Sequence, residues 1–173
     1  MPKDAVMFAY ALYRRGLVTE GWQVLQRIYQ HSQDFAVSRM YPGIPEYFDA
    51  RGRGMYPYLT GSASWYLLTL VSQALGVRGD LGDPVLAPKL VRGQFDGAGS
   101  ASITTLFAGR RLEITYFNEE CLDWDGYRVG TVAIDDVPVP VTVVPGGVSV
   151  AREVITSLSA DLTHRIEVSL VRR

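Results

Sequence analysis

The run "MYPYLTGSASWYLLTLVSQALGV", Met55 to Val77, decides how the first half of this chain folds. It turns at Thr60-Gly61-Ser62 and is then apolar at nearly every position. This pattern predicts a helix from about Ser62 to Leu75, with Gly76 as the C-terminal stop. Because the helix is apolar almost all round, we expect it to lie between other layers rather than on a surface.

The Thr-Gly-Ser turn at the start of this helix has two possible roles. The first N–H groups of a helix lack intrahelical partners, and the helix dipole adds partial positive charge there. Gly61 would let an anion approach those groups, and Thr60 would add a hydroxyl donor. The same residues are also typical of a simple N-cap. The turn therefore predicts either an anion site or a helix cap.

The residues before this run predict a pair of antiparallel helices. Apolar residues recur at helical spacing up to Gly16, a plausible C-cap, and again from about Thr19 to Gln33. The short link makes the two helices antiparallel neighbours. Each has an apolar stripe too wide for a hairpin that stands alone. We therefore expect association, either with an upstream part of the same protein or with a second copy.

A long segment between the helices, from Asp34 to Leu59, is rich in proline, glycine and aromatic residues. Ordered loops of this length are usually functional. Its aromatic residues, beside Arg51 and Arg53, suit stacking against a sugar or a nucleobase, or they plug the end of a helical layer. These residues are Tyr41, Tyr47, Phe48, Tyr56 and Tyr58.

Beyond Arg78 the sequence predicts strands. "ASITTLFAGRRLEITYFN" indicates a hairpin around a Gly-Arg turn, and further turns are expected at Asp135-Asp136 and Gly146-Gly147. "HRIEVSLVRR" indicates a last strand, and "GDLGDPVLAPKLV" a junction. The prediction is an α+β protein with a helical domain over 1–78 and an antiparallel β-sandwich-like domain over 79–173.

Composition excludes several classes of function. The formal net charge of −1 gives no attraction to nucleic acid or to an anionic membrane, and neither is expected as a partner. Cys121 is the only cysteine, so the chain has no internal disulfide and no zinc motif, and we expect the cytoplasm. Acidic Glu119 and Glu120 precede Cys121 and argue against a catalytic thiolate.

The segment "GIPEYFDARGRGMYPYLTGSASWYLLTLVSQALGVRGDLGDPVLAPKL" resembles the C-terminal part of the glycoside phosphorylases of glycoside hydrolase family 94. That family includes cellobiose, chitobiose and β-1,2-glucan phosphorylases and the phosphorylase-like part of cyclic β-1,2-glucan synthases. "YLTGSASW" followed by "LGVRGDLG" is the most specific element. The resemblance implies that the helices are the last ones of an (α/α)6 barrel and that a C-terminal β-domain follows.

The resemblance also implies roles for individual residues. Thr60 and Gly61 would bind inorganic phosphate, the co-substrate of the reaction, and no other cofactor or metal is implied. Glu46 and Tyr47 align with a stretch that lines the sugar site. Arg51 and Arg53 have no secure counterpart, and they would assist the anion or form salt bridges.

Parts of the family's active site do not occur in this chain. The general acid is an aspartate within a pattern like "GDWNDG"; "DWDG" at Asp123 to Gly126 instead suggests a hairpin turn. A phosphate-binding histidine should precede the first helix, and His31 and His164 lie elsewhere. The expectation is a C-terminal fragment of an inverting glycoside phosphorylase (a glycosyltransferase) for β-linked glucosides, catalytically silent alone. A non-catalytic carbohydrate- or anion-binding module and a structural remnant are the alternatives.

Overall fold

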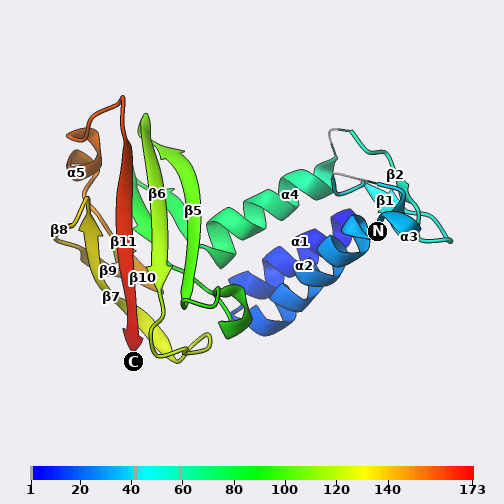
Figure 1. Ribbon diagram of the computed structural model, residues 1–173, viewed down its shortest axis with the longest axis horizontal. Coiled ribbons are helices and arrows are strands. Elements are labelled where there is room, and N and C mark those ends of the chain that lie inside the picture. Colours follow the sequence, from blue (N-terminus) through cyan, green and yellow to red (C-terminus); the bar gives the residue numbers. More distant parts are fainter. Residues whose placement is uncertain (1, 41–42, 59) are drawn as a thin grey trace. The chain divides into compact units, whose positions relative to one another are not determined.

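The computed structural model describes residues 2–40, 43–58 and 60–173, and its three longest helices precede the two larger sheets in chain order (Figure 1). The α+β class predicted from the sequence is confirmed. The chain divides into two compact units, Met1–Ala74 and Leu75–Arg173. The helices of the described residues do not close into a barrel. None of these helices is both long enough and apolar enough to cross a lipid bilayer.

The first unit begins with the predicted helical hairpin, α1 (Pro2–Arg14) and α2 (Val18–Gln33). Gly16 has φ +79° and ends α1, and the Leu17 N–H donates to the Leu12 carbonyl at 2.9 Å. Such a left-handed residue is a common helix stop, so the predicted cap is confirmed. The buried apolar side chains of the pair come from both helices: Val6, Ala9, Tyr13, Val18, Leu25 and Ile28.

The segment expected to be a long loop contains short regular elements. One helical turn, α3 (Phe35–Ser38), follows α2 directly. A two-residue ladder then joins β1 (Tyr47–Phe48) to β2 (Gly54–Met55) in antiparallel register. Among the aromatic residues predicted here, Tyr41 lies outside the described residues. The ladder matters for the site because it fixes the backbone directly after Glu46.

The helix predicted to begin near Ser62 is α4 (Gly61–Thr69), and a π-helical turn, η1 (Leu70–Ala74), continues it. The extent of the helix is confirmed, but the prediction that it is buried on nearly all sides is wrong. Leu67 and Leu68 are 62% and 46% exposed. The buried face instead carries polar side chains, including Ser62 and Thr69. Those groups are tolerated there because they hydrogen-bond to carbonyls, as Thr69 does to Trp65 at 2.7 Å.

The second unit starts with a hairpin where a simple junction was expected. Strands β3 (Val77–Asp80) and β4 (Asp83–Leu86) pair through a turn at Leu81 and Gly82. Leu81 adopts φ +51°, which a leucine rarely does, so the residues of this turn gave no signal. With β9 (Thr142–Val144) and β10 (Gly147–Ser149), the hairpin forms a four-stranded antiparallel sheet in the order β3-β4-β10-β9.

A five-stranded sheet forms the rest of the second unit, in the order β5-β6-β11-β7-β8. Its strands are β5 (Ser100–Phe107), β6 (Arg110–Phe117), β7 (Tyr127–Ile134), β8 (Val137–Pro138) and β11 (Thr163–Arg172). β11 pairs parallel to β6 and antiparallel to β7, so the expectation of a purely antiparallel domain is wrong. The chain reaches β11 through a short helix, α5 (Arg152–Thr156), and β11 enters between two earlier strands.

The predicted turns are confirmed in part. Ala108 and Gly109 connect β5 to β6, and both have positive φ, as tight hairpin turns require. Asp135 and Asp136 do the same between β7 and β8. The β5–β6 turn lies one residue before the predicted Gly-Arg turn, because Arg110 already belongs to β6. The third turn precedes the predicted position by one residue, because Gly147 already belongs to β10. Asp123 to Gly126 is a turn but not a hairpin turn, because β11 separates β6 from β7.

Candidate functional site

The N-terminus of α4 is the predicted anion site, and Thr60 is its N-cap. The Thr60 Oγ1 accepts a hydrogen bond from the Ala63 N–H at 3.0 Å. The same hydroxyl donates to the Ile44 carbonyl at 2.8 Å, and the residue is buried. A threonine hydroxyl has one proton to donate. In this conformation, therefore, Thr60 acts as a cap and its proton is directed toward the chain.

The carboxylate of Glu46 lies against the first N–H groups of α4. Its Oε2 accepts from the Ser62 N–H at 3.0 Å, while the Ser62 hydroxyl donates to the Glu46 carbonyl at 3.0 Å. The Lys3 Nζ stands 3.6 Å from the other carboxylate oxygen, Oε1. The N-terminus of α4 thus binds a negative charge, and that charge is the carboxylate of the protein's own Glu46.

These contacts change the acidity of Glu46. The Ser62 N–H bonds to the ionised carboxylate and so lowers the pKa of Glu46 below its ordinary value. The charge of Lys3 and the Gly61 N–H lower this pKa further, while partial desolvation opposes them. The carboxylate is therefore ionised at neutral pH.

Gly61 allows the close approach of this carboxylate. A Cβ placed on Gly61 would stand 3.4 Å from both oxygens of Glu46 and from the Lys3 Cε. That distance is at the near limit of ordinary contact, so glycine leaves room for the carboxylate and the Lys3 side chain beside this backbone. The structure thus brings Thr60, Gly61 and Glu46 together at one helix end, with Lys3 as a fourth participant.

Tyr47 belongs to an aromatic group beside this helix end. Its ring lies 5.9 Å from the ring of Tyr56, centroid to centroid, and the two planes are tilted by 44°. The Glu46 N–H donates to the Tyr56 carbonyl at 3.2 Å, which ties the aromatic pair to the acidic residue. Tyr56 and Tyr58 are 69% and 80% exposed. The exposed ring of Tyr56 is therefore tied through its own backbone to Glu46, the residue whose carboxylate binds the start of α4.

The two arginines of this segment follow Asp49 in the chain, and only the side chain of Arg53 pairs with it. The carboxylate of Asp49 accepts from the backbone N–H groups of Arg51 and Arg53 and from the Arg53 Nε at 3.1 Å. The Arg53 N–H is the main reason that the pKa of Asp49 lies below its ordinary value. Of the two roles considered for these arginines, the structure shows a salt bridge for Arg53.

Both histidines have local partners. The His31 Nε2 lies 2.8 Å from the Gly52 carbonyl, which can only accept, so this nitrogen carries the proton. Its ring packs edge-on against Phe48. His164, in β11, bonds to Asp135 and to the Ser159 carbonyl. Cys121 is exposed. The described residues contain no group of three or more acidic, histidine or cysteine side chains that could hold a metal ion.

Sequence reasoning did not identify Lys3 as part of the site. No local pattern distinguishes this lysine, because α1 brings it to the start of α4 only once the helices have packed. A search of protein-family models and a search of curated proteins found no match to this chain.

Proposed function

We propose that this chain is the C-terminal part of an inverting glycoside phosphorylase similar to those of glycoside hydrolase family 94. The first unit would be the end of an (α/α)6 barrel, and the second a C-terminal β-domain with a sandwich-like arrangement. In the parent reaction, phosphate attacks the anomeric carbon of a β-glucoside from the face opposite the general acid, releasing an α-sugar 1-phosphate. The proposed location is the cytoplasm.

One observation carries the proposal: the start of α4 already holds an anion. The Glu46 carboxylate accepts from the Ser62 N–H and lies beside Gly61 and Lys3. Inorganic phosphate would use the same donors, with Thr60 rotated to donate to it. Glu46 must then turn away, and as a sugar-site residue it would turn toward a hydroxyl of the substrate. Its carboxylate would thus occupy the phosphate position until both substrates bind.

The proposed partner is the upstream part of the same enzyme, which would supply the general-acid aspartate. Exposed apolar side chains on all three long helices of the first unit support this. Phe8 on α1 is 58% exposed, Tyr29 on α2 is 51% exposed, and Leu67 on α4 is 62% exposed. The isolated chain is expected to be catalytically silent, because the sequence resemblance accounts for the phosphate side of the site alone.

Calorimetric titration of the whole chain with phosphate tests the anion site. Wild type is expected to bind weakly, with a Kd of about 1 mM or higher, because Glu46 competes. The Glu46→Gln variant removes the competing charge and should bind about tenfold more tightly. Thr60→Val should lose detectable binding. Thr104→Val, at an exposed position of β5, is the matched control and should behave as wild type.

Two outcomes would contradict the proposal. If neither wild type nor Glu46→Gln binds phosphate, the helix end is only a cap and this chain offers no working anion site. If the isolated chain itself phosphorolyses a β-linked disaccharide, the general acid is present and the fragment assignment is wrong. Because Thr60→Val also removes an N-cap, its thermal unfolding midpoint must be measured beside its affinity.

A second candidate function is a non-catalytic carbohydrate-binding module. The observation that favours it is the exposure of Tyr56 and Tyr58 beside Tyr47. Aromatic rings with one free face can stack on the apolar face of a sugar. Titration with cellobiose in the absence of phosphate separates the two functions. A module would bind the sugar alone and lose it in Tyr58→Ala, whereas a phosphorylase fragment depends on phosphate and on Thr60.

A further inference from the structure

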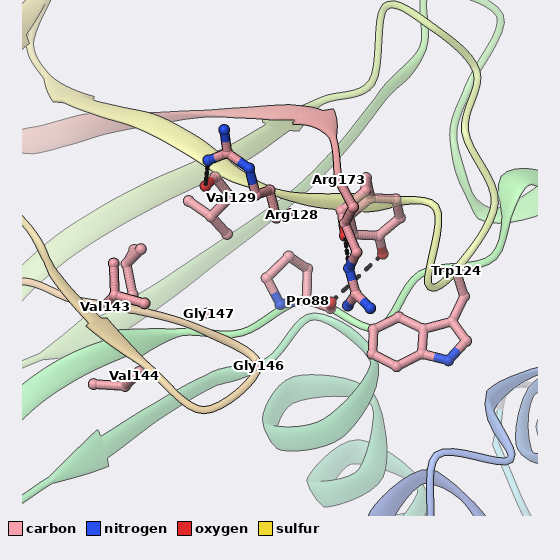
Figure 2. Close-up of a pocket in the computed structure, with 11 residues that line it drawn as sticks. Pro88, Trp124, Arg128, Val129, Val143, Val144, Gly146, Gly147 and Arg173 are labelled. Carbon is pink, nitrogen blue, oxygen red and sulfur yellow. Dashed lines mark hydrogen bonds between the residues drawn. The ribbon is translucent and has the colours of Figure 1, made fainter.

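The second unit contains a pocket that the proposed function does not use. It has a volume of about 300 Å³ and is lined entirely by residues of that unit. Figure 2 shows Pro88 at its centre, Trp124 and Arg173 on one side, and the hairpin carrying Val143 and Val144 on the other. This volume is at the small end for ligand sites, so it suits a single-ring compound.

The walls of the pocket are apolar. Pro88, Val129, Val144 and Val148 line it beside the ring of Trp124. Tyr127 lines it as well, but its hydroxyl accepts from the Leu90 N–H at 2.7 Å and donates to the Leu90 carbonyl. The phenol oxygen is therefore committed to the backbone, and Tyr127 offers a ligand only its ring. A bound molecule would need an apolar or planar body.

The cationic side chains that line the pocket are Arg128 and Arg173. The backbone N–H of Arg173 donates to the Gly126 carbonyl, and its Nε donates to the Tyr127 carbonyl at 2.8 Å. Its guanidinium also lies 5.7 Å from the centre of the Trp124 ring. These contacts fix the side chain, and Figure 2 shows its guanidinium between Pro88 and Trp124. Its terminal amino groups make no hydrogen bond with the described residues and are free to donate to a ligand.

Neither of these two arginines forms an ion pair with an acidic side chain of the described residues. No aspartate or glutamate lines the pocket. The ion pairs of the second unit involve Arg165, Arg172 and His164, and neither Arg128 nor Arg173 takes part in one. Arg128 makes only a long bond, 3.5 Å, from Nη1 to the Val129 carbonyl. Guanidinium groups bind carboxylates and phosphates with two parallel hydrogen bonds.

We propose that this pocket binds a small anion with a planar apolar body, namely an aryl carboxylate or an aryl phosphate. The ring lies against Pro88 and the valines of the β9–β10 hairpin, beside Trp124. The anionic group accepts hydrogen bonds from Arg173, and Arg128 rotates away from the Val129 carbonyl to donate to the same group. This site is separate from the start of α4 and does not depend on the proposed phosphorolysis.

NMR titration of the whole chain tests the site, with the indole N–H of Trp124 as the reporter. Phenyl phosphate and benzoate are the two probes, and either one binding identifies the preferred head group. Benzyl alcohol and inorganic phosphate each carry half of the recognised features and should bind at least about tenfold more weakly. The indole signals of Trp22 and Trp65, which lie in the first unit, should not move.

Single substitutions then assign the binding to the arginines. Arg128→Met and Arg173→Met keep an apolar stem and remove the charge, so each should weaken binding about tenfold. Arg111→Met, at an exposed position of β6, is the matched control and should leave the affinity unchanged. The proposal fails if neither probe shifts the Trp124 signal. It also fails if benzyl alcohol binds as tightly as phenyl phosphate, or if the control loses affinity as the two pocket variants do.

Discussion

At the scale of single residues, the two most informative side chains are Glu46 and His164, because hydrogen bonds fix the charge of each. Glu46 is fixed by an N–H group of α4. His164 is buried and hydrogen-bonds through both ring nitrogens, to Asp135 at 2.6 Å and to the Ser159 carbonyl at 2.9 Å. A carbonyl and a carboxylate both accept, so two donating nitrogens satisfy them best, which is the protonated imidazolium.

The stability of the second unit should therefore fall as the pH rises past neutrality. The hydrogen bond to Asp135 is the main cause that raises the pKa of His164, and the Ser159 carbonyl adds to it, while desolvation and Arg110 oppose it. A folded pKa above the unfolded value of about 6.5 means that this stabilisation is full below that pH. It is lost as the pH rises through the folded pKa.

Thermal unfolding between about pH 5 and about pH 9 measures this effect. The wild-type midpoint should decline by about 2–4 °C more than that of His164→Asn over this range. The pKa of Asp135 is lowered, mainly by His164, so the Asp135 carboxylate loses its contribution only in acid, below about pH 4. Asp135→Asn should remove most of the same pH dependence. Equal slopes in all three proteins would show that the imidazole stays neutral.

At the scale of helices and strands, the sequence predicted what local chemistry controls. Gly16 and Gly76 both mark helix ends at positive φ, and the Asp135-Asp136 turn has the φ values that its residues favour. What was missed depends on contacts between distant segments. Alternation identifies β11 as a strand but cannot reveal that β6 is its parallel neighbour. The turn at the start of α4 was likewise predicted from its own residues. Lys3 was not, because only the packing of α1 brings it there.

Gly76 offers a test of how tightly the end of the helical region is specified. It has φ +66°, and a Cβ there would overlap the carbonyl of Ala87. Its own carbonyl accepts from the Ala87 N–H at 3.0 Å, so the backbones cannot separate without losing that bond. Gly76→Ala should lower the free energy of unfolding by about 2–4 kcal/mol, from strain and overlap together.

Chemical denaturation of the two proteins measures this loss. Gly97→Ala is the matched control, because Gly97 has no positive φ and a Cβ there would meet nothing within 4 Å. The control should change the free energy of unfolding by less than about 1 kcal/mol. If Gly76→Ala is no worse than the control, the backbone at this point can relax, and the glycine is not required.

At the scale of the whole molecule, exposed apolar surface is the main property that calls for a partner. Leu67 and Leu68 are adjacent on α4 and both are substantially exposed, although the helix buries serine and threonine on its other face. The first unit also exposes Phe8, Tyr29 and Phe35. Exposed apolar surface in this amount is the reason that we expect a partner for the first unit.

The isolated chain should therefore self-associate, because a second copy can cover this apolar surface. Light scattering across a concentration series should show the mass rising above that of one chain, 19.2 kDa, as the protein is concentrated. Replacing Leu67 and Leu68 together by serine should weaken this association at least about tenfold. Two leucines that become buried between copies contribute a few kcal/mol to the free energy of association, about 1.5–3 kcal/mol each. Since both side chains are exposed, the fold should tolerate the change. Leu81→Ser, at a fully exposed turn residue of the second unit, is the control and should associate as wild type does. A chain that stays monomeric at every concentration, and binds no hydrophobic dye, would show that α4 needs no partner and would remove this support for the proposed upstream part of the enzyme.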